Sequence, residues 1–370
     1  MDVDEVGIEI MLQKAQHYLI QIDALTIPAA NILKQELLSL GGDAALHRGA
    51  CNFSIRETPC IMMGTHQHFE RLSKKLAAQP FGLKKIAKEL KQALRNFLLV
   101  PPTLVAGPFI FDFTRSPFVM GILNMTPDSF SGDGIPNTKE LLKKAEKMLE
   151  DGADLLDVGG ESTRPGATPV SVEEERKRVI PAIKALAKRF KIPISVDTSK
   201  GEIAEEALNA GAHLINDVSG LMKDPRMAKV AKRYDSPLVV MHHQKEEHDL
   251  IGRMANFFEE RLLALEKEGI PRNKVILDPG IGFGKTGAEN FFVLKRMEEF
   301  KCFGRPLLLG ASRKSFIGHV LKQEANERLI GSVTSQVFGF FSGAHFFRVH
   351  DVREAREALM LSKAILEADV

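Results

Sequence analysis

Short apolar runs that end in a polar residue recur eight times in the second part of the chain, and this recurrence constrains the fold more than any other feature. The runs are FVMGILN, LLDVGGES, PISVDTS, HLINDVSG, PLVVMHH, VILDPG, PLLLGAS and HFFRVHD, and their polar end residues are Asn124, Asp157, Asp197, Asn216, His242, Asp278, Ser312 and Arg348. Seven steps separate Asn124 from Arg348, so the mean step is 32 residues. One strand, one helix and their loops fit that length, and eight such units predict a TIM barrel.

The segments between these runs carry helix signals. Ser171, Ser199 and Asp351 each stand three positions before a glutamate, which is the spacing of a helix capping box. Strands that are apolar almost throughout indicate a parallel sheet whose outer face is covered by helices. The predicted fold class is therefore α/β, with a TIM (β/α)8 barrel. An open doubly wound sheet, which usually has fewer strands, is the alternative.

Residues 1–100 have a different pattern. AANILKQELLSLGG is typical of a helix that ends at glycine, PCIMMGT of a buried strand, and HFERLSKKLAAQ and LKKIAKELKQALRNFL of two amphipathic helices. The Pro101-Pro102 pair cannot continue a helix, which favours a domain boundary there. We predict a smaller N-terminal α+β domain over residues 1–100 and the barrel over residues 103–370, with FIFDFTRSPF as a hairpin that closes the bottom of the barrel.

Composition excludes several classes of protein. The chain has 370 residues, 44% of them hydrophobic, and a net charge of +2, which argues against a general nucleic-acid binder. No apolar run approaches the length of a membrane span, and the acidic start MDVDEVGIEIMLQK does not match a secretory signal. The 3 cysteines are odd in number and lack CxxC spacing, which fits a reducing compartment. We expect a cytoplasmic protein without a nucleic-acid or membrane partner.

The segment ILDPGIGFGKT, residues 276–286, has the glycines, lysine and threonine of a nucleotide phosphate loop. A Walker A loop needs its first glycine five positions before the glycine that precedes the lysine, and that position is Pro279. Proline lacks the N–H that the phosphate cradle requires. The segment is therefore not predicted to bind nucleotide phosphate, and Lys285 and Thr286 are expected to lie outside the chemistry.

Polar side chains at strand ends are candidates for function because the active site of a TIM barrel lies at the C-terminal ends of its strands. Asp197, Asn216 and Asp278 supply carboxylate and amide groups that can bind an amidine-type edge, as found on guanine or a pterin. The alternative for this set is a metal site, because Asp and Asn also bind hard cations. For any single residue, capping of the next helix is an equally good explanation.

The last strand carries Arg348 and His350 on one face, directly before a helix that starts at Asp351. A cationic pair at a helix N-terminus favours an anion, and TIM barrels often hold phosphate at this place. A surface salt bridge is the alternative. The nearby segment GASRKS, residues 310–315, adds the mobile charge of Lys314 and the hydroxyl of Ser315, although this motif alone is not specific.

Two long polar loops follow short strands. NMTPDSFSGDG covers residues 124–134 and ESTRPGA covers residues 161–167. Their proline, glycine, hydroxyl and charged residues suit loops that fold over a substrate, and a plain surface turn is the alternative. The sequence has no HExxH or G-x-S-x-G motif, and His242-His243 lacks the neighbours of a zinc site.

Taken in order, the motifs GILNMTPDSFS, DVGGESTRPGA, SVDTS, INDVSG, DPGIGFGKT, GASRKS and RVHDV closely resemble the dihydropteroate synthase family. The resemblance covers about residues 103–370. It implies a TIM barrel that joins 6-hydroxymethyl-7,8-dihydropterin pyrophosphate to p-aminobenzoate, releases pyrophosphate and requires Mg²⁺. It also implies a transferase of folate biosynthesis and a sulfonamide target.

The same resemblance assigns residues to each part of the site. The implied pterin residues are Asp197, Asn216, Met241, Asp278 and Lys314. The implied pyrophosphate residues are Asn124, Arg348 and His350, with Asn124 also binding Mg²⁺. The implied p-aminobenzoate residues are Phe130, Ser162, Thr163, Arg164, Pro165, Phe283, Lys314 and Ser315. Those given a catalytic role are Asp197, Lys314, Arg348 and His350.

Two other functions remain open on the sequence alone. A pterin-dependent methyltransferase, which passes a methyl group from methyltetrahydrofolate to a corrinoid, would share the pterin residues but has no use for the Arg348 and His350 pair. A non-catalytic pterin-binding barrel would keep the pocket without turnover. We expect a homodimer with small-molecule substrates, and an assembly or regulatory role for residues 1–100.

Overall fold

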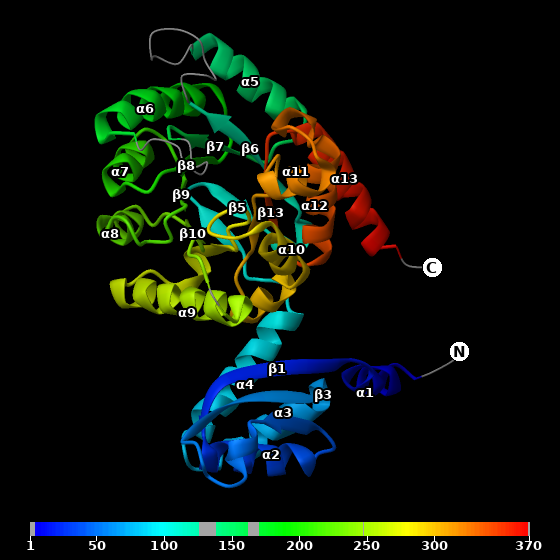
Figure 1. The fold of residues 1–370 in the computed structure, drawn as a ribbon. Helices are drawn as coiled ribbons and strands as arrows, with labels where there is room; N and C mark the ends of the chain where they lie inside the picture. The colour runs from blue at the N-terminus through cyan, green and yellow to red at the C-terminus, as the bar shows by residue number, and fades with distance from the viewer. Residues whose placement is uncertain (1–3, 126–137, 162–169, 247, 369–370) are drawn as a thin grey trace. The chain divides into compact units, whose positions relative to one another are not determined.

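The computed structural model describes residues 4–125, 138–161, 170–246 and 248–368. Two compact units make up the chain, Met1–Leu99 and Val100–Val370. Figure 1 shows the first unit in blue and cyan and the second in cyan to red. None of the helices within the described residues is long and apolar enough to cross a membrane.

The N-terminal unit combines an antiparallel sheet of order β1-β3-β2 with helices. Its elements are α1 (Glu5–Ala15), β1 (His17–Thr26), α2 (Ile27–Leu38), β2 (Asp43–Leu46), β3 (Glu57–Thr65), α3 (His66–Leu76) and α4 (Leu83–Leu98). The predicted α+β class is confirmed, and α2, β3, α3 and α4 lie close to their predicted ranges. The sequence pattern missed α1, β1 and β2. In β1, Tyr18, Ile20 and Ile22 alternate with exposed residues and pack half-buried against the core of this unit.

Among the described residues of the second unit, eight parallel strands form one sheet of order β11-β10-β9-β8-β7-β6-β13-β12. A parallel bridge between Leu277 and Leu307 joins the two ends of that order, and Leu277 N donates to Pro306 O at 3.0 Å. The sheet is therefore closed. The predicted TIM barrel is confirmed, and the open doubly wound alternative is wrong.

Each barrel strand is followed by helical structure, which surrounds the strands in Figure 1. The strands are β6 (Phe118–Asn124), β7 (Leu155–Gly159), β8 (Ile194–Asp197), β9 (Leu214–Asp217), β10 (Leu238–Met241), β11 (Val275–Asp278), β12 (Leu308–Leu309) and β13 (Phe346–Val349). The helices are α5 (Thr138–Glu150), α6 (Val172–Arg189), α7 (Gly201–Asn209), α8 (Arg226–Arg233), α9 (Leu250–Glu268), α10 (Gly287–Lys295), α11 (Ser315–Leu321), α12 (Leu329–Phe341) and α13 (Val352–Leu366).

The bottom of the barrel, at the N-terminal ends of its strands, is filled by an aromatic plug. β4 (Leu104–Ala106) and β5 (Phe109–Phe111) form a hairpin, which begins earlier in the chain than the predicted FIFDFTRSPF segment. Phe111 packs edge-on against Phe346 of β13 with ring centroids 5.1 Å apart, and Phe113 and Phe118 join the same cluster. Such buried aromatic contacts are a large source of core stability.

Helix starts followed the capping signals only in part. Ser171 caps α6 by accepting a hydrogen bond from Glu174 N at 3.2 Å. α7 begins after Lys200 and not after Ser199. Asp351 is the N-cap of α13, but its carboxylate pairs with Arg313 and makes no capping bond. The Asp351 side chain thus bonds to a charged neighbour and not to the backbone of its own helix.

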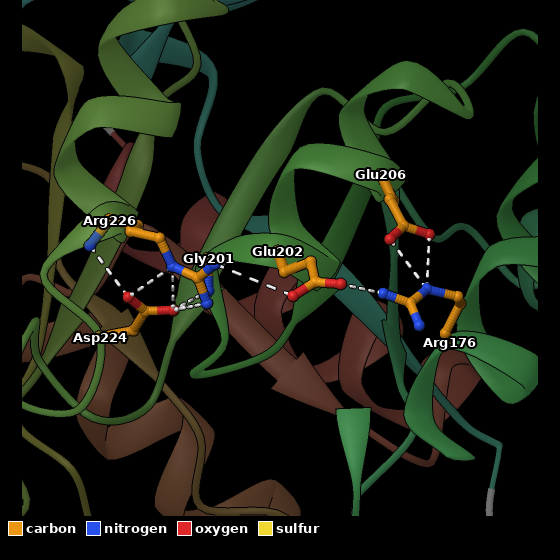
Figure 2. Close-up of polar contacts among 6 residues, drawn as sticks. All are labelled: Arg176, Gly201, Glu202, Glu206, Asp224 and Arg226. Carbon is orange, nitrogen blue, oxygen red and sulfur yellow. Dashed lines mark hydrogen bonds and ion pairs between the residues drawn. The ribbon is translucent and has the colours of Figure 1, made fainter. Parts of the chain in front are cut away.

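Ion pairs link neighbouring outer helices. Figure 2 shows one such network, formed by Arg176, Gly201, Glu202, Glu206, Asp224 and Arg226. Arg176 of α6 donates from Nε to Glu206 of α7 at 2.8 Å, and Glu202 of α7 lies 3.8 Å from Arg226 at the start of α8. Exposed pairs of this kind are screened by solvent and contribute little to stability, so they link the outer helices without defining the site.

Candidate active site

The mouth of the barrel, at the C-terminal ends of its strands, gathers charged and amide side chains that are almost entirely buried. Asp197 ends β8, Asn216 is the third residue of β9 and Asp278 ends β11. Their exposed fractions are 6%, 2% and 6%. Met241 ends β10 between them and is also buried. The structure therefore brings the predicted pterin residues together on consecutive strands.

Arg348 connects two carboxylates across the mouth. Its Nε donates to Asp157 Oδ2 at 2.6 Å, and its Nη2 donates to Asp197 Oδ2 at 2.8 Å. Burial would lower the pKa of Arg348, but the carboxylates of Asp157 and Asp197 raise it above its ordinary value. Burial raises the pKa of Asp197 to about 7, since Arg348 offsets only part of that cost and nearby carboxylates add to it. The mouth is a charged cluster held out of water.

A glycine-rich loop follows Asp278 and turns away from the mouth. Gly280 has a φ of +67°, and a Cβ there would lie 1.9 Å from His242 O, so a larger residue cannot take this place. Gly280 N donates to Asp278 Oδ1 at 2.7 Å. This bond fixes one carboxylate oxygen of Asp278. The loop therefore needs glycine for a tight turn beside Asp278 and not for binding nucleotide phosphate.

Lys285 holds this loop together, which the sequence did not predict. Its Nζ donates to three carbonyl oxygens, those of His242 at 3.2 Å, Gly280 at 3.1 Å and Phe283 at 3.1 Å. Burial lowers the pKa of Lys285 to about 8, although Asp278 raises it. The expectation that Lys285 lies outside the chemistry still stands, but the residue shapes the loop that carries Phe283. A lysine inside a glycine-rich loop, where carbonyl oxygens lack helix or strand partners, was the sequence signal that could have indicated this role.

Lys314 lies between the two substrate regions that the sequence predicts. Its Nζ lies 4.2 Å from the ring centroid of Phe283 and donates to Ile281 O. Burial lowers the pKa of Lys314 to about 7, although the carboxylate of Asp278 raises it. Ser315 begins α11 and is exposed. Lys314 can therefore contact a ligand near Asp278 and one near Phe283.

The structure corrects the charge that the sequence predicts for His350. Its Nδ1 lies 3.0 Å from Ser312 Oγ, and burial together with the cationic Arg348 lowers the pKa of His350 to about 4. His350 is neutral at pH 7 in this structure, and Arg348 is already paired with carboxylates. The predicted cationic pair is therefore a single buried cation beside a neutral imidazole.

Other predicted residues have different outcomes. Asn124 ends β6 at the mouth and is half-buried, paired in register with Gly159 of β7. Five predicted p-aminobenzoate residues lie outside the described residues: Phe130, Ser162, Thr163, Arg164 and Pro165. Within the described residues, no group of three or more His, Cys, Asp or Glu side chains is arranged to hold a metal ion.

Comparison with known proteins gives this geometry a family. The family model described as "Pterin binding enzyme" matches residues 120–350. Dihydropteroate synthase of Escherichia coli strain K12 is 45% identical over 262 residues, which cover 68% of this chain and 93% of the relative. The crystal structure of Yersinia pestis dihydropteroate synthase with a sulfonamide drug is 42% identical, with a TM-score of 0.68 over 72% of this chain and 100% of that one.

A longer relative also matches the N-terminal unit. A probable bifunctional folylpolyglutamate synthase/dihydropteroate synthase of Halobacterium salinarum is 40% identical over 345 residues, 90% of this chain, which is more than Val100–Val370 can supply. The chain spans 41% of the length of that relative. Family model, relatives and solved structure agree over the barrel. The chain therefore belongs to the dihydropteroate synthase family of pterin-binding enzymes.

Proposed function

We propose that the barrel mouth joins 6-hydroxymethyl-7,8-dihydropterin pyrophosphate to p-aminobenzoate, giving 7,8-dihydropteroate and pyrophosphate. The observation that carries this proposal is the cluster of Asp197, Asn216, Asp278 and Arg348 at the strand ends of one barrel, with Lys314 beside it at the start of α11. In the reaction the aryl amine nitrogen attacks the pterin methylene carbon. The bond between that carbon and the pyrophosphate oxygen breaks, and the amine loses one proton.

The pterin end of the substrate would lie on the buried acceptors. A pterin presents adjacent N–H and NH₂ donors, and carboxylates can accept both at once. Asp197, Asn216 and Asp278 provide such acceptors, and Met241 supplies an apolar surface. Positive charge that develops on the pterin as pyrophosphate leaves would be stabilised by the nearby carboxylates. Lys314, with its pKa lowered to about 7, would contact the same ring.

The pyrophosphate would lie nearer Asn124, Arg348 and His350. Neutral His350 and the amide of Asn124 can hydrogen-bond to phosphate oxygens, and Arg348 supplies charge. The single amide oxygen of Asn124 suits Mg²⁺, which commonly keeps waters and binds substrate phosphates beside one or two protein ligands. Mg²⁺ would neutralise charge on the leaving group. If so, chelating divalent cations should stop turnover and adding Mg²⁺ should restore it.

The p-aminobenzoate would lie between Phe283, Lys314 and Ser315. The half-buried ring of Phe283 offers a stacking surface, and Lys314 Nζ lies over that ring. The family resemblance also assigns Phe130, Ser162, Thr163, Arg164 and Pro165 to p-aminobenzoate, and these five residues lie outside the part of the chain that the structure describes. An aryl amine is neutral at pH 7, so its attack needs little help from a base. A sulfonamide has the shape of p-aminobenzoate and should compete with it.

The direct test is to mix the purified chain with both substrates and Mg²⁺ and to measure both products. We expect dihydropteroate and pyrophosphate in equal amounts, and neither product when p-aminobenzoate is left out. Methyl transfer to a corrinoid, or pterin binding without turnover, would contradict the proposal.

We also propose a homodimer in a reducing, cytoplasmic environment. Cys51, Cys60 and Cys302, which all lie within the described residues, form no disulfide. α12 and α13 pack against each other and expose large apolar side chains, among them Ile330, Phe338 and Phe341 of α12 and Leu361 and Ile365 of α13. A contiguous apolar surface of this kind often marks an interface. Sedimentation should give twice the chain mass, and Ile330→Glu should give the monomer. The N-terminal unit would serve assembly or regulation.

A further inference from the structure

Asp157 is a buried carboxylate with no role in the reaction proposed above. It is the third residue of β7, and none of its surface is exposed. Its Oδ2 accepts hydrogen bonds from Arg348 Nε at 2.6 Å and from Asn216 Nδ2 at 3.2 Å. Arg348 comes from β13 and Asn216 from β9. One carboxylate thus contacts two of the residues that the proposed function assigns to the substrate.

The strand register places Asp157 deeper in the barrel than Asp197. Asp157 pairs with Ser195, whereas Gly159, two residues later on β7, pairs with Asp197. Side chains two residues apart on a strand point to the same side, so Asp157 lies below Asp197. From this position Asp157 contacts Arg348 and Asn216.

The contact decides which end of the Asn216 amide faces the ligand. A carboxylate oxygen can only accept, so the NH₂ group of Asn216 must point to Asp157. Asn216 Oδ1 then points elsewhere, and within the described part of the chain this buried atom has no hydrogen-bond partner. A buried acceptor without a partner is costly unless a ligand donor satisfies it. The N–H edge of a pterin is such a donor.

The same contact fixes Arg348. With Nε on Asp157 and Nη2 on Asp197, the plane of the guanidinium is set by two carboxylates. Without Asp157, Arg348 could turn toward Asp197 alone and compete with the ligand for that carboxylate.

We propose that Asp157 is a positioning residue for the pterin end of the site, which turns the Asn216 oxygen toward the ligand and holds Arg348 in place. The proposal rests on the proposed function. Asp157 acts through its two neighbours and does not itself touch the reacting atoms.

The test compares Asp157→Asn with Asp154→Asn in the full chain. Asp154 is a matched control because it also pairs with an arginine, Arg356, and also accepts a second hydrogen bond, from Val119 N, but it lies at the bottom of the barrel. In steady-state assays Asp157→Asn should raise KM for the pterin pyrophosphate about 10- to 100-fold, the usual cost of a lost hydrogen bond to a charged group. KM for p-aminobenzoate should stay within about twofold, and Asp154→Asn should leave both values near wild type.

A pH profile separates positioning from packing. The pKa of Asp197 is raised by burial, lowered by Arg348 and raised again by Asp157, Glu175 and Asp217. Removing the charge of Asp157 should therefore lower this pKa. The acid limb of kcat/KM for the pterin substrate should move to lower pH in Asp157→Asn and stay in place in Asp154→Asn. A purely structural role would not move that limb.

Wild-type KM and an unmoved acid limb in Asp157→Asn would overturn the proposal, while an active wild-type enzyme would leave the proposed function intact. If the wild-type enzyme makes no dihydropteroate, the proposed function itself fails. Should Asp157→Asn not fold, Asp157→Ser keeps a hydroxyl acceptor for Asn216 but no charge, and the same shift of the acid limb is expected.

Discussion

The two ends of the barrel strands differ in the kind of side chain that they bury. At the bottom, the rings of Phe111 and Phe346 pack into an apolar plug closed by a hairpin. At the mouth, the same strands present Asp157, Asp197 and Arg348, which are withdrawn from water. Buried charges cost stability even when paired, and apolar packing supplies it. The chain therefore gains stability at one end of the barrel strands, and the other end can carry the residues for chemistry.

Arg348→Ala, at the mouth, should have the largest effect on activity. Both Asp157 and Asp197 would be left without their cation, and the loss of one partner of a buried charge pair costs about 3–5 kcal/mol. Separately, the loss of the Arg348 charge from the substrate site should lower kcat/KM for the pterin pyrophosphate about 10³-fold, which corresponds to about 4 kcal/mol of transition-state stabilisation. Arg356→Ala is the matched control, since Arg356 pairs with Asp154 at the bottom of the barrel. It should lower the melting temperature and leave the kinetics near wild type.

Phe346→Ala, at the bottom of the barrel, should lower stability and leave the kinetics unchanged. Phe346 is completely buried and contacts Phe111, Phe113 and Phe118. Truncating such a side chain costs about 3–5 kcal/mol of unfolding free energy, which denaturant titration would measure. Folded Phe346→Ala should keep its KM values. Changed KM values at full folding would show that the two ends are coupled.

Lys285→Gln should have a smaller effect, confined to one loop. The change removes the charged donor to the carbonyl oxygens of Gly280 and Phe283, so the ring of Phe283 loses its fixed position. We expect KM for p-aminobenzoate to rise about tenfold, in line with the loss of hydrogen bonds from a charged group. KM for the pterin substrate should change less. Equal rises in both values would show that the loop supports the whole mouth.

A further prediction concerns the pH dependence of stability. The pKa of Asp197 is raised to about 7 by burial, above its value near 3.9 in an unfolded chain. The folded protein therefore binds this proton more tightly, so the stability that Asp197 contributes is complete below about pH 4 and is lost as pH rises through about 7. The ligand-free wild type should lose stability over that range relative to Asp197→Asn. Parallel pH curves for the two proteins would refute the raised pKa.

The barrel could be predicted from sequence because each unit repeats the same signal, an apolar run with a polar end. Asp197, Asn216 and Asp278 could be named because they stand at those ends. Asp157 stands at such an end too, but its value comes from contacts with Arg348 and Asn216 that lie 191 and 59 residues away in the chain. No local pattern reports such contacts.

The charge of His350 and the role of Lys285 also escaped prediction for physical reasons. A histidine has an ordinary pKa near neutrality, so only burial beside Arg348 reveals that His350 is neutral. Lys285 stands where a phosphate-binding lysine would stand, and only the fold shows that it binds carbonyl oxygens instead. In β1, the alternating residues Tyr18, Ile20 and Ile22 are only half-buried, and the strand was not predicted.

Steady-state kinetics of Asp197→Asn test most directly whether the mouth binds the pterin substrate while the bottom supports the fold. Asp197 is buried at the end of β8 and would accept hydrogen bonds from the pterin. We expect kcat/KM for the pterin pyrophosphate to fall about 100-fold or more, as for a lost charged acceptor, with a melting temperature at pH 7 that is no lower than that of the wild type. Wild-type kinetics in this variant would contradict the account.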